Sequence, residues 1–211
     1  FVTGFFIISG FLTFNNYIKT PDVRVFALKR VRRICPAYML AVLSCFVLGM
    51  VLTTHSLGDF LSNPQTWKYL AANICFLNYL QPTLPGVFEQ NVLHAMNASL
   101  WTMKVEIMFY ATVPVVHWLI RRFGKNKVLL TIVSLSILYN VVTAELYAYT
   151  ANPLFSSLNH QIFGVLSFFY APVLILVNRE WITKHLRPLL AISLLLHLLS
   201  HWYQRFGYVD A

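Results

Sequence analysis

Long apolar runs separated by short polar segments make up most of this chain of 211 residues. About 20 apolar residues are needed to cross a membrane as a helix, and backbone polar groups in hydrocarbon must bond within their own segment. The pattern therefore predicts an all-α fold, a polytopic bundle of transmembrane helices. The predicted spans are 1–14, which is incomplete, followed by 36–54, 100–120, 128–149, 161–178 and 188–203.

Two apolar runs are too short to span. Residues 70–80 predict a re-entrant or interfacial helix, ended by the turn at Pro82, Pro85 and Gly86. The first run starts at Phe1 rather than at a methionine, so we expect a chain truncated at its N-terminus. No internal repeat or low-complexity stretch divides the sequence, which predicts one membrane-embedded domain over residues 1–211.

Composition supports a membrane protein. Hydrophobic residues make up 58% of the chain and charged residues 11%, too few charges to cover a globular surface in water. The net charge of +9 does not indicate a nucleic-acid partner, because the cations lie between apolar runs rather than along one polar face.

The cations also predict the topology. Thirteen of the sixteen Lys and Arg residues lie in three alternate loops, at 15–34, 121–127 and 179–187. Cytoplasmic loops of membrane proteins carry such an excess, so these three loops are predicted to be cytoplasmic. The segment 55–99 then lies on the outer side of the membrane.

The densest cation cluster, residues 29–33, directly precedes the second predicted span. Arg30 and Arg33 are three positions apart and would share a helix face, where two guanidinium groups suit a phosphate or a carboxylate. Cations beside a membrane can also serve only as topology signals and headgroup anchors, and spacing does not exclude this alternative.

Two further features are costly or unusual inside predicted spans. An acid at the centre of a span costs about 2.5 kcal/mol or more, so Glu106 is expected to face a cavity or a partner. Alternatively, Glu106 and Lys104 form an interfacial pair that reaches toward water. Ser9 and Gly10 form a small step between phenylalanines, which also suits close helix packing.

The histidines and cysteines of the chain do not predict a metal site. His197 and His201 are four positions apart, as two metal ligands on a helix can be, but no carboxylate in that span completes a set. The three cysteines are isolated and fit small buried hydrophobic positions. We therefore predict no metal and no disulfide.

Three ordered motifs resemble the membrane-bound acyltransferase-3 family of bacterial O-acyltransferases. Residues 5–11, FFIISGF, are similar to the family's FFxxSGF step, and residues 30–38, RVRRICPAY, to its RxxRIxPxY segment. Residues 84–88, LPGVF, and 97–106, NASLWTMKVE, resemble the LPGVF and NGSLWTLKVE stretch of one subgroup. The resemblance extends from residue 1 to about residue 114; beyond residue 120 it is limited to hydrophobic helices.

This resemblance implies a multi-pass protein of the inner membrane, in contact with lipid. It would move an acyl group, usually acetyl, from cytoplasmic acyl-CoA to a hydroxyl of a surface glycan, with no bound cofactor. Arg30 and Arg33 then contact the CoA phosphates, and Ser9 and Gly10 line the donor channel. Glu106 supports catalysis by orienting the acceptor or the active-site network. The last motif also contributes residues with an acceptor-side or structural role: Asn97, Trp101 and Lys104.

The sequence departs from the family pattern in one respect. The family's general base is a histidine in a span upstream of FFxxSGF, after an arginine, and here that position falls before Phe1. None of the seven histidines of the chain matches it. Two other functions stay open: a polytopic transporter of an anionic substrate, and a catalytically inactive membrane subunit.

Overall fold

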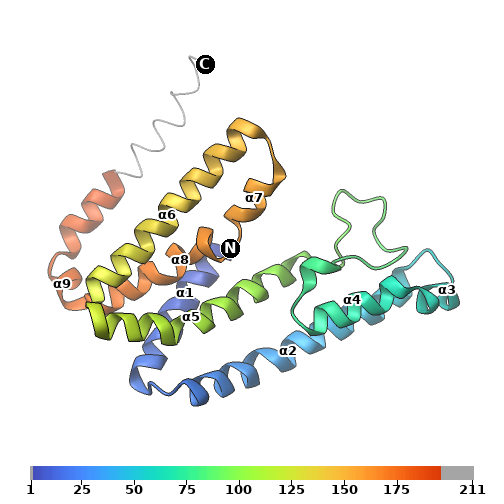
Figure 1. The fold of residues 1–211 in the computed structure, drawn as a ribbon, viewed down its shortest axis with the longest axis horizontal. Helices are drawn as coiled ribbons and strands as arrows, with labels where there is room; N and C mark the ends of the chain where they lie inside the picture. Colours follow the sequence, from blue (N-terminus) through green and yellow to red (C-terminus); the bar gives the residue numbers. More distant parts are fainter. Residues whose placement is uncertain (1, 196–211) are drawn as a thin grey trace.

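The computed structural model describes residues 2–195, and within that range the chain forms helices and turns and no strand (Figure 1). The predicted all-α fold is confirmed. The α-helices are α1 (Val2–Lys19), α2 (Val23–Leu52), α3 (Leu57–Ser62), α4 (Pro64–Ile74), α5 (Trp101–Phe123), α6 (Lys125–Thr150), α7 (Pro153–Asn159), α8 (Ile162–Val177) and α9 (Arg179–Lys184), with short 3₁₀ helices η1 (Asn78–Leu80) and η2 (Ala98–Leu100).

Several helices begin at a local capping signal. The side chain of Asp22 accepts a hydrogen bond from the backbone N–H of Val25 at the start of α2. Asn63 and Asn152 do the same for α4 and α7, each directly before a proline at the first helical position. A short oxygen-bearing side chain satisfies backbone N–H groups that have no partner in the first turn, and proline needs none there.

Four helical segments are long and apolar enough to cross a membrane: Val23–Leu52, Ala98–Phe123, Lys125–Thr150 and Pro153–Val177. They contain most or all of the predicted spans 36–54, 100–120, 128–149 and 161–178, which supports a multi-pass membrane protein. Helix α1 runs beyond the apolar run 1–14, to Lys19. The predicted span 188–203 extends outside the described residues; its described part belongs to the apolar helix Leu186–Leu195.

The prediction that residues 15–34 form a loop is wrong. Helix α1 ends at Lys19 and α2 begins at Val23, so the cation cluster 29–33 lies within the first turns of α2. Lysine and arginine lose little side-chain freedom in a helix, and the Asp22 cap sets its start, so the helix extends past the apolar run. Likewise α7 and α9 occupy much of the connections predicted at 150–160 and 179–187.

The three cation-rich stretches nevertheless gather at one end of the molecule. Figure 1 shows the α1–α2, α5–α6 and α8–α9 connections at the same side of the bundle. Lys125 Nζ donates to the carbonyl oxygen of Val177 (2.7 Å), and Asn178 Nδ2 donates to Asn126 Oδ1 (2.8 Å). The alternation of cations along the chain therefore corresponds to two ends of the bundle, and the cytoplasmic placement of this end stays a prediction.

The prediction of one helix over residues 70–80 is also wrong. Helix α4 ends at Ile74, and Phe76 adopts a left-handed backbone conformation with φ of 60°. The buried Asn73 explains the turn, because its Nδ2 donates to the carbonyl oxygens of Tyr69 (2.8 Å) and Gln81 (3.1 Å). This amide ties the helix end to the returning chain, before the proline turn is reached.

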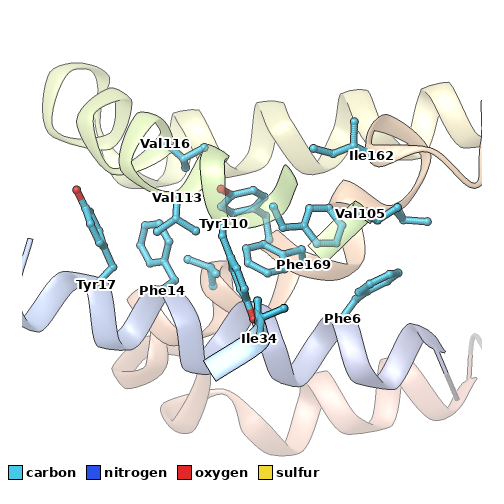
Figure 2. Packing of buried hydrophobic residues seen from close by; sticks show 14 of the residues in the cluster. Phe6, Phe14, Tyr17, Ile34, Val105, Tyr110, Val113, Val116, Ile162 and Phe169 are labelled. Carbon is cyan, nitrogen blue, oxygen red and sulfur yellow. The ribbon is translucent and has the colours of Figure 1, made fainter. Parts of the chain in front are cut away.

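The core forms where α1, α2, α5 and α8 meet. Side chains from these helices point toward one another in Figure 2, among them Phe6 of α1, Tyr110 of α5 and Phe169 of α8. Phe109 stacks on Phe169 with ring centroids 4.5 Å apart and meets Phe6 edge-on at 5.1 Å. Such offset and edge-to-face aromatic pairs add to the stabilisation from burial alone.

Close packing at Gly10 brings α1 against α8. A Cβ at this position would lie 2.0 Å from the carbonyl oxygen of Phe169, so only glycine permits the approach. Small residues are what allow helix backbones to come this close in membranes. The packing interpretation of the Ser9–Gly10 step therefore holds for Gly10.

Replacing Gly10 by alanine should lower the thermal unfolding midpoint of the protein in detergent. The added methyl must push α1 and α8 apart, and overpacking of this kind costs about 1–3 kcal/mol. Gly4→Ala is the matched control on the same helix, because a Cβ there meets nothing within 4 Å. Equal midpoints for the two variants would contradict the described α1–α8 contact.

Candidate functional site

A buried carboxylate lies at the centre of the site. Glu106, in the second turn of α5, is 5% exposed. Its Oε1 accepts hydrogen bonds from Ser9 Oγ of α1 (3.1 Å) and from the hydroxyl of Tyr110, one turn further along α5. Within residues 2–195, Oε2 has no hydrogen-bond partner. Two hydroxyl donors on one oxygen stabilise the buried group and leave the other free for a ligand.

Lys104 does not pair with Glu106. Its Nζ donates to Gln161 Oε1 (3.0 Å) and lies 4.6 Å from the ring centroid of Tyr79. Positions 104 and 106 are two apart on α5 and so point to different sides of the helix. The alternative of an interfacial Lys104–Glu106 pair is therefore wrong.

Arg30 of α2 lies beside this cluster. Its guanidinium carbon is 4.9 Å from the ring centroid of Tyr110 and 5.2 Å from that of Phe26, a cation–π arrangement on both rings. The residue is 9% exposed, and its Nε is buried without a hydrogen-bond partner in the described part of the chain. Buried donors are nearly always satisfied, so this unused capacity is what an anionic ligand would fill.

A basic cavity of about 380 Å³ opens between the end of α1 and the start of α2. Four of its lining residues are cations and no lining residue among those described is acidic. Its lining residues are Asn16, Lys19, Thr20, Val25, Phe26, Lys29, Arg30 and Arg33. A cavity with this charge suits an anionic group such as a phosphate.

A second cavity, here called the carboxylate cavity, also measures about 380 Å³ and contains Glu106. Its polar lining residues are Arg33, Tyr38, Asn97, Ser99, Thr102, Glu106 and Tyr110. Glu106 is the one acid, and there is no histidine, among the lining residues that the structure describes. Arg33 lines both cavities, so a ligand held through an anionic group at the arginines can extend toward the carboxylate.

The structure brings together five of the residues that the sequence singled out. Ser9, Glu106, Arg30, Arg33 and Asn97 lie in the cluster or line the two cavities. Asn97 Nδ2 also contacts Cys45 Sγ at 3.7 Å, which ties the start of η2 to α2.

Three predicted residues lie elsewhere. Trp101 lines a different cavity, where its ring meets that of His160 edge-on at 5.9 Å. Lys104 bonds Gln161, and Gly10 packs on α8. The predicted roles of these three residues in donor binding or on the acceptor side stay predictions.

Sequence reasoning did not select Tyr110, Tyr38 or Lys29 as site residues. Tyr110 follows Glu106 by four positions, and that spacing places both on one helix face, so helical periodicity could have identified it. Tyr38 stacks on Phe76 at 4.0 Å, a contact that depends on the turn after α4. No sequence signal indicates that contact.

No group of three or more His, Cys, Asp or Glu residues within residues 2–195 is placed to hold a metal ion. The pair His197 and His201 lies outside the described residues.

Comparisons with known proteins agree with the motif resemblance. A family model described as an acyltransferase domain matches residues 1–209. Nodulation protein 10 of Rhizobium leguminosarum bv. viciae is 30% identical over 139 residues, which cover 63% of this chain and 37% of that protein. The O-acetyl transferase of Shigella phage Sf6 is 30% identical over 143 residues, which cover 65% of this chain and 40% of that protein. The matches thus span about two fifths of these curated relatives, and no solved structure matches.

Removing the Tyr110 hydroxyl should destabilise the protein more than removing a comparable hydroxyl elsewhere. In Tyr110→Phe, the buried Glu106 loses a charge-assisted hydrogen bond, a loss of about 1.5–3 kcal/mol. The control Tyr170→Phe removes a buried hydroxyl 2.7 Å from Thr112 Oγ1, a neutral pair with a contribution of about 0.5–1.5 kcal/mol. Thermal unfolding in detergent measures both variants. A smaller loss in Tyr110→Phe than in Tyr170→Phe would contradict the described cluster.

Proposed function

The chain belongs to the acyltransferase-3 family, and we propose that it forms part of a multi-pass O-acyltransferase of the inner membrane. The proposed reaction transfers an acyl group, acetyl in the first instance, from acyl-CoA to a hydroxyl of a surface or exported glycan. The relative named as an O-acetyl transferase supports the reaction type. Acyl-CoA as the donor, a glycan as the acceptor and the inner membrane as the location are proposed.

The observation that carries the proposal is the shared wall of the two cavities. Coenzyme A is an anionic donor because of its phosphate groups, and arginine holds phosphate through paired N–H groups. The basic cavity offers Lys19, Lys29, Arg30 and Arg33 to those phosphates. Because Arg33 also lines the carboxylate cavity, the thioester end of such a donor can reach the surroundings of Glu106.

The acceptor hydroxyl is proposed to bind at Glu106. Its Oε2 is free to accept a hydrogen bond from that hydroxyl, while Ser9 and Tyr110 hold Oε1 in place. The hydroxyl oxygen then attacks the thioester carbonyl carbon, the carbon–sulfur bond breaks, and the CoA thiolate takes up the proton that the hydroxyl gives up. Positioning of the two reactants in this way is a major source of rate enhancement.

Proton removal is not assigned to a residue of this chain. The carboxylate cavity has no histidine among its described lining residues, and the general base that the family resemblance implies would precede Phe1. General-base catalysis contributes typically about 10²–10⁴-fold to the rate of such a reaction. Glu106 is proposed instead to orient the acceptor hydroxyl and to stabilise its charge distribution.

The distribution of cations supports the direction of transfer. The cation-rich connections lie at one end of the bundle (Figure 1), and Asn97 and Ser99, from the segment between α4 and α5, line the carboxylate cavity. With the cation-rich end in the cytoplasm, donor and acceptor approach the site from opposite sides of the membrane.

Replacing Arg33 by alanine should raise the KM for acetyl-CoA at least tenfold. One charged hydrogen bond to a phosphate contributes about 1.5–3 kcal/mol, which is about tenfold or more in affinity. Transfer of radiolabelled acetyl from acetyl-CoA to the glycan, in membranes that carry the full-length gene product, measures the effect. Arg32→Ala is the control, because Arg32 is exposed and is not among the lining residues of either cavity.

Glu106→Gln should abolish transfer while the protein still reaches the membrane. Amide replacement keeps the size of the side chain and removes the charge that orients the hydroxyl. Unchanged acetylation in both Arg33→Ala and Glu106→Gln would contradict the proposed roles. Uptake of an anionic substrate without an acylated product would instead show a transporter.

A further inference from the structure

A third cavity, of about 300 Å³, lies apart from the two already described and shares no lining residue with them. Residues from α1, α5, α6, α7 and α8 surround it, and none of the described lining residues is an acid, a lysine or an arginine. We call it the amide cavity. Its lining residues are Val2, Thr3, Phe6, Trp101, Asn140, Asn159, His160, Val165 and Phe168.

The two asparagines are held by each other and by α8. Asn140 Nδ2 donates to Asn159 Oδ1 (2.5 Å) and to the carbonyl oxygen of Gly164 (3.1 Å), which uses both of its hydrogens. Among the described residues, Asn140 Oδ1 and Asn159 Nδ2 then have no partner. A Cβ on Gly164 would lie 2.0 Å from the carbonyl oxygen of Asn159, so glycine is required for this arrangement.

His160 adds a second free acceptor. Its Nδ1 lies 2.8 Å from the carbonyl oxygen of Ser156, and because a carbonyl only accepts, Nδ1 carries the hydrogen. In the neutral ring, Nε2 is then an acceptor without a partner in the described part of the chain. The residues that line the cavity therefore carry two acceptors, Asn140 Oδ1 and His160 Nε2, and one donor, Asn159 Nδ2, that have no partner among the described residues.

Aromatic side chains form the apolar part of the wall. Trp101 is half-buried and meets His160 edge-on, and Phe6 and Phe168 line the same space. A small number of convergent polar groups within an aromatic wall is typical of small-molecule sites. A ligand that matches this wall must supply both hydrogen-bond donors and an acceptor, and it must have an apolar face for the rings.

Neutral sugars have this chemistry. Each hydroxyl donates one hydrogen bond and accepts others, and the C–H face of a pyranose ring packs on aromatic rings. The absence of a cation among the described lining residues disfavours a sugar acid or a sugar phosphate. We propose that the amide cavity binds one neutral pyranose unit of the acceptor, adjacent to the unit that is acylated.

The location fits this assignment, which rests on the proposed function. Trp101 begins the helix that carries Glu106, and Phe6 precedes Ser9 on α1 by three positions. The cavity and the carboxylate cluster thus have two helices in common, α1 and α5. Asn159 and His160 of the cavity come from the α7–α8 junction, which lies at the end of α8 that faces away from the cation-rich connections (Figure 1).

Two variants test the site in the full-length protein. His160→Phe keeps the aromatic contact with Trp101 and removes the Nε2 acceptor, and Asn159→Ala removes the free donor. The control Asn126→Ala removes an amide pair with Asn178 at the opposite end of α6. Thermal unfolding midpoints near that of the control show that each variant is folded.

Binding is measured by saturation-transfer NMR in detergent. The probes are methyl pyranosides of gluco, galacto, manno and rhamno configuration, with glucuronate as the charged comparison. We expect one or more neutral pyranosides to bind, and glucuronate to bind more weakly. Both site variants should weaken binding about threefold to tenfold, the effect of one lost hydrogen bond, and Asn126→Ala should not. No binding of any neutral pyranoside, or equal binding by all variants, would overturn the site.

Acyl-transfer kinetics separate this inference from the proposed function. Loss of groups that bind only the non-reacting part of the acceptor should raise the acceptor KM with little change in kcat. Transfer with an unchanged acceptor KM in both variants would refute the sugar site and leave the function intact. Sugar binding that the variants weaken, in a full-length protein without acyl transfer, would support the site and refute the function.

Discussion

A carboxylate inside a helix bundle must be supplied with hydrogen-bond donors, and much of this molecule is arranged around that requirement. Glu106 receives a donor from its own helix, Tyr110, and one from α1, Ser9. Gly10, the neighbour of Ser9, lets α1 lie directly on α8, so the helix that supplies this donor is also packed against α8. Tyr110 in turn supports Arg30 with its ring, so α2 is tied to the same cluster. The position of four helices is thus linked to one charged group.

This arrangement separates two kinds of chemistry. The basic cavity concentrates positive charge at one end of the bundle, whereas the described wall of the amide cavity is uncharged and aromatic. The carboxylate cavity adjoins the basic cavity through Arg33 and has two helices, α1 and α5, in common with the amide cavity. An anionic and a neutral ligand can therefore be recognised without competing for the same side chains.

Much of the fold could be predicted from the sequence, because helices that cross a membrane are forced by the chemistry of the hydrocarbon phase. Arg30, Arg33 and Glu106 could also be selected, the arginines from helical spacing and the acid from the cost of burying it. The helix ends could not, since Asp22 and Asn73 act through contacts that an apolar run does not reveal. Neither could the amide cavity, because Asn140 and Asn159 become a pair only when α6 and α7 fold back on each other.

The length of α2 has a consequence for the membrane around it. Its 30 residues make a helix about 45 Å long, while the hydrocarbon layer is about 30 Å thick. The helix must therefore tilt or project, and its cationic first turns come to lie at the level of the lipid headgroups. Bilayer thickness and headgroup charge then set how far Arg30 and Arg33 stand from water. The lipid composition of the surrounding membrane thus becomes a determinant of how accessible these two arginines are.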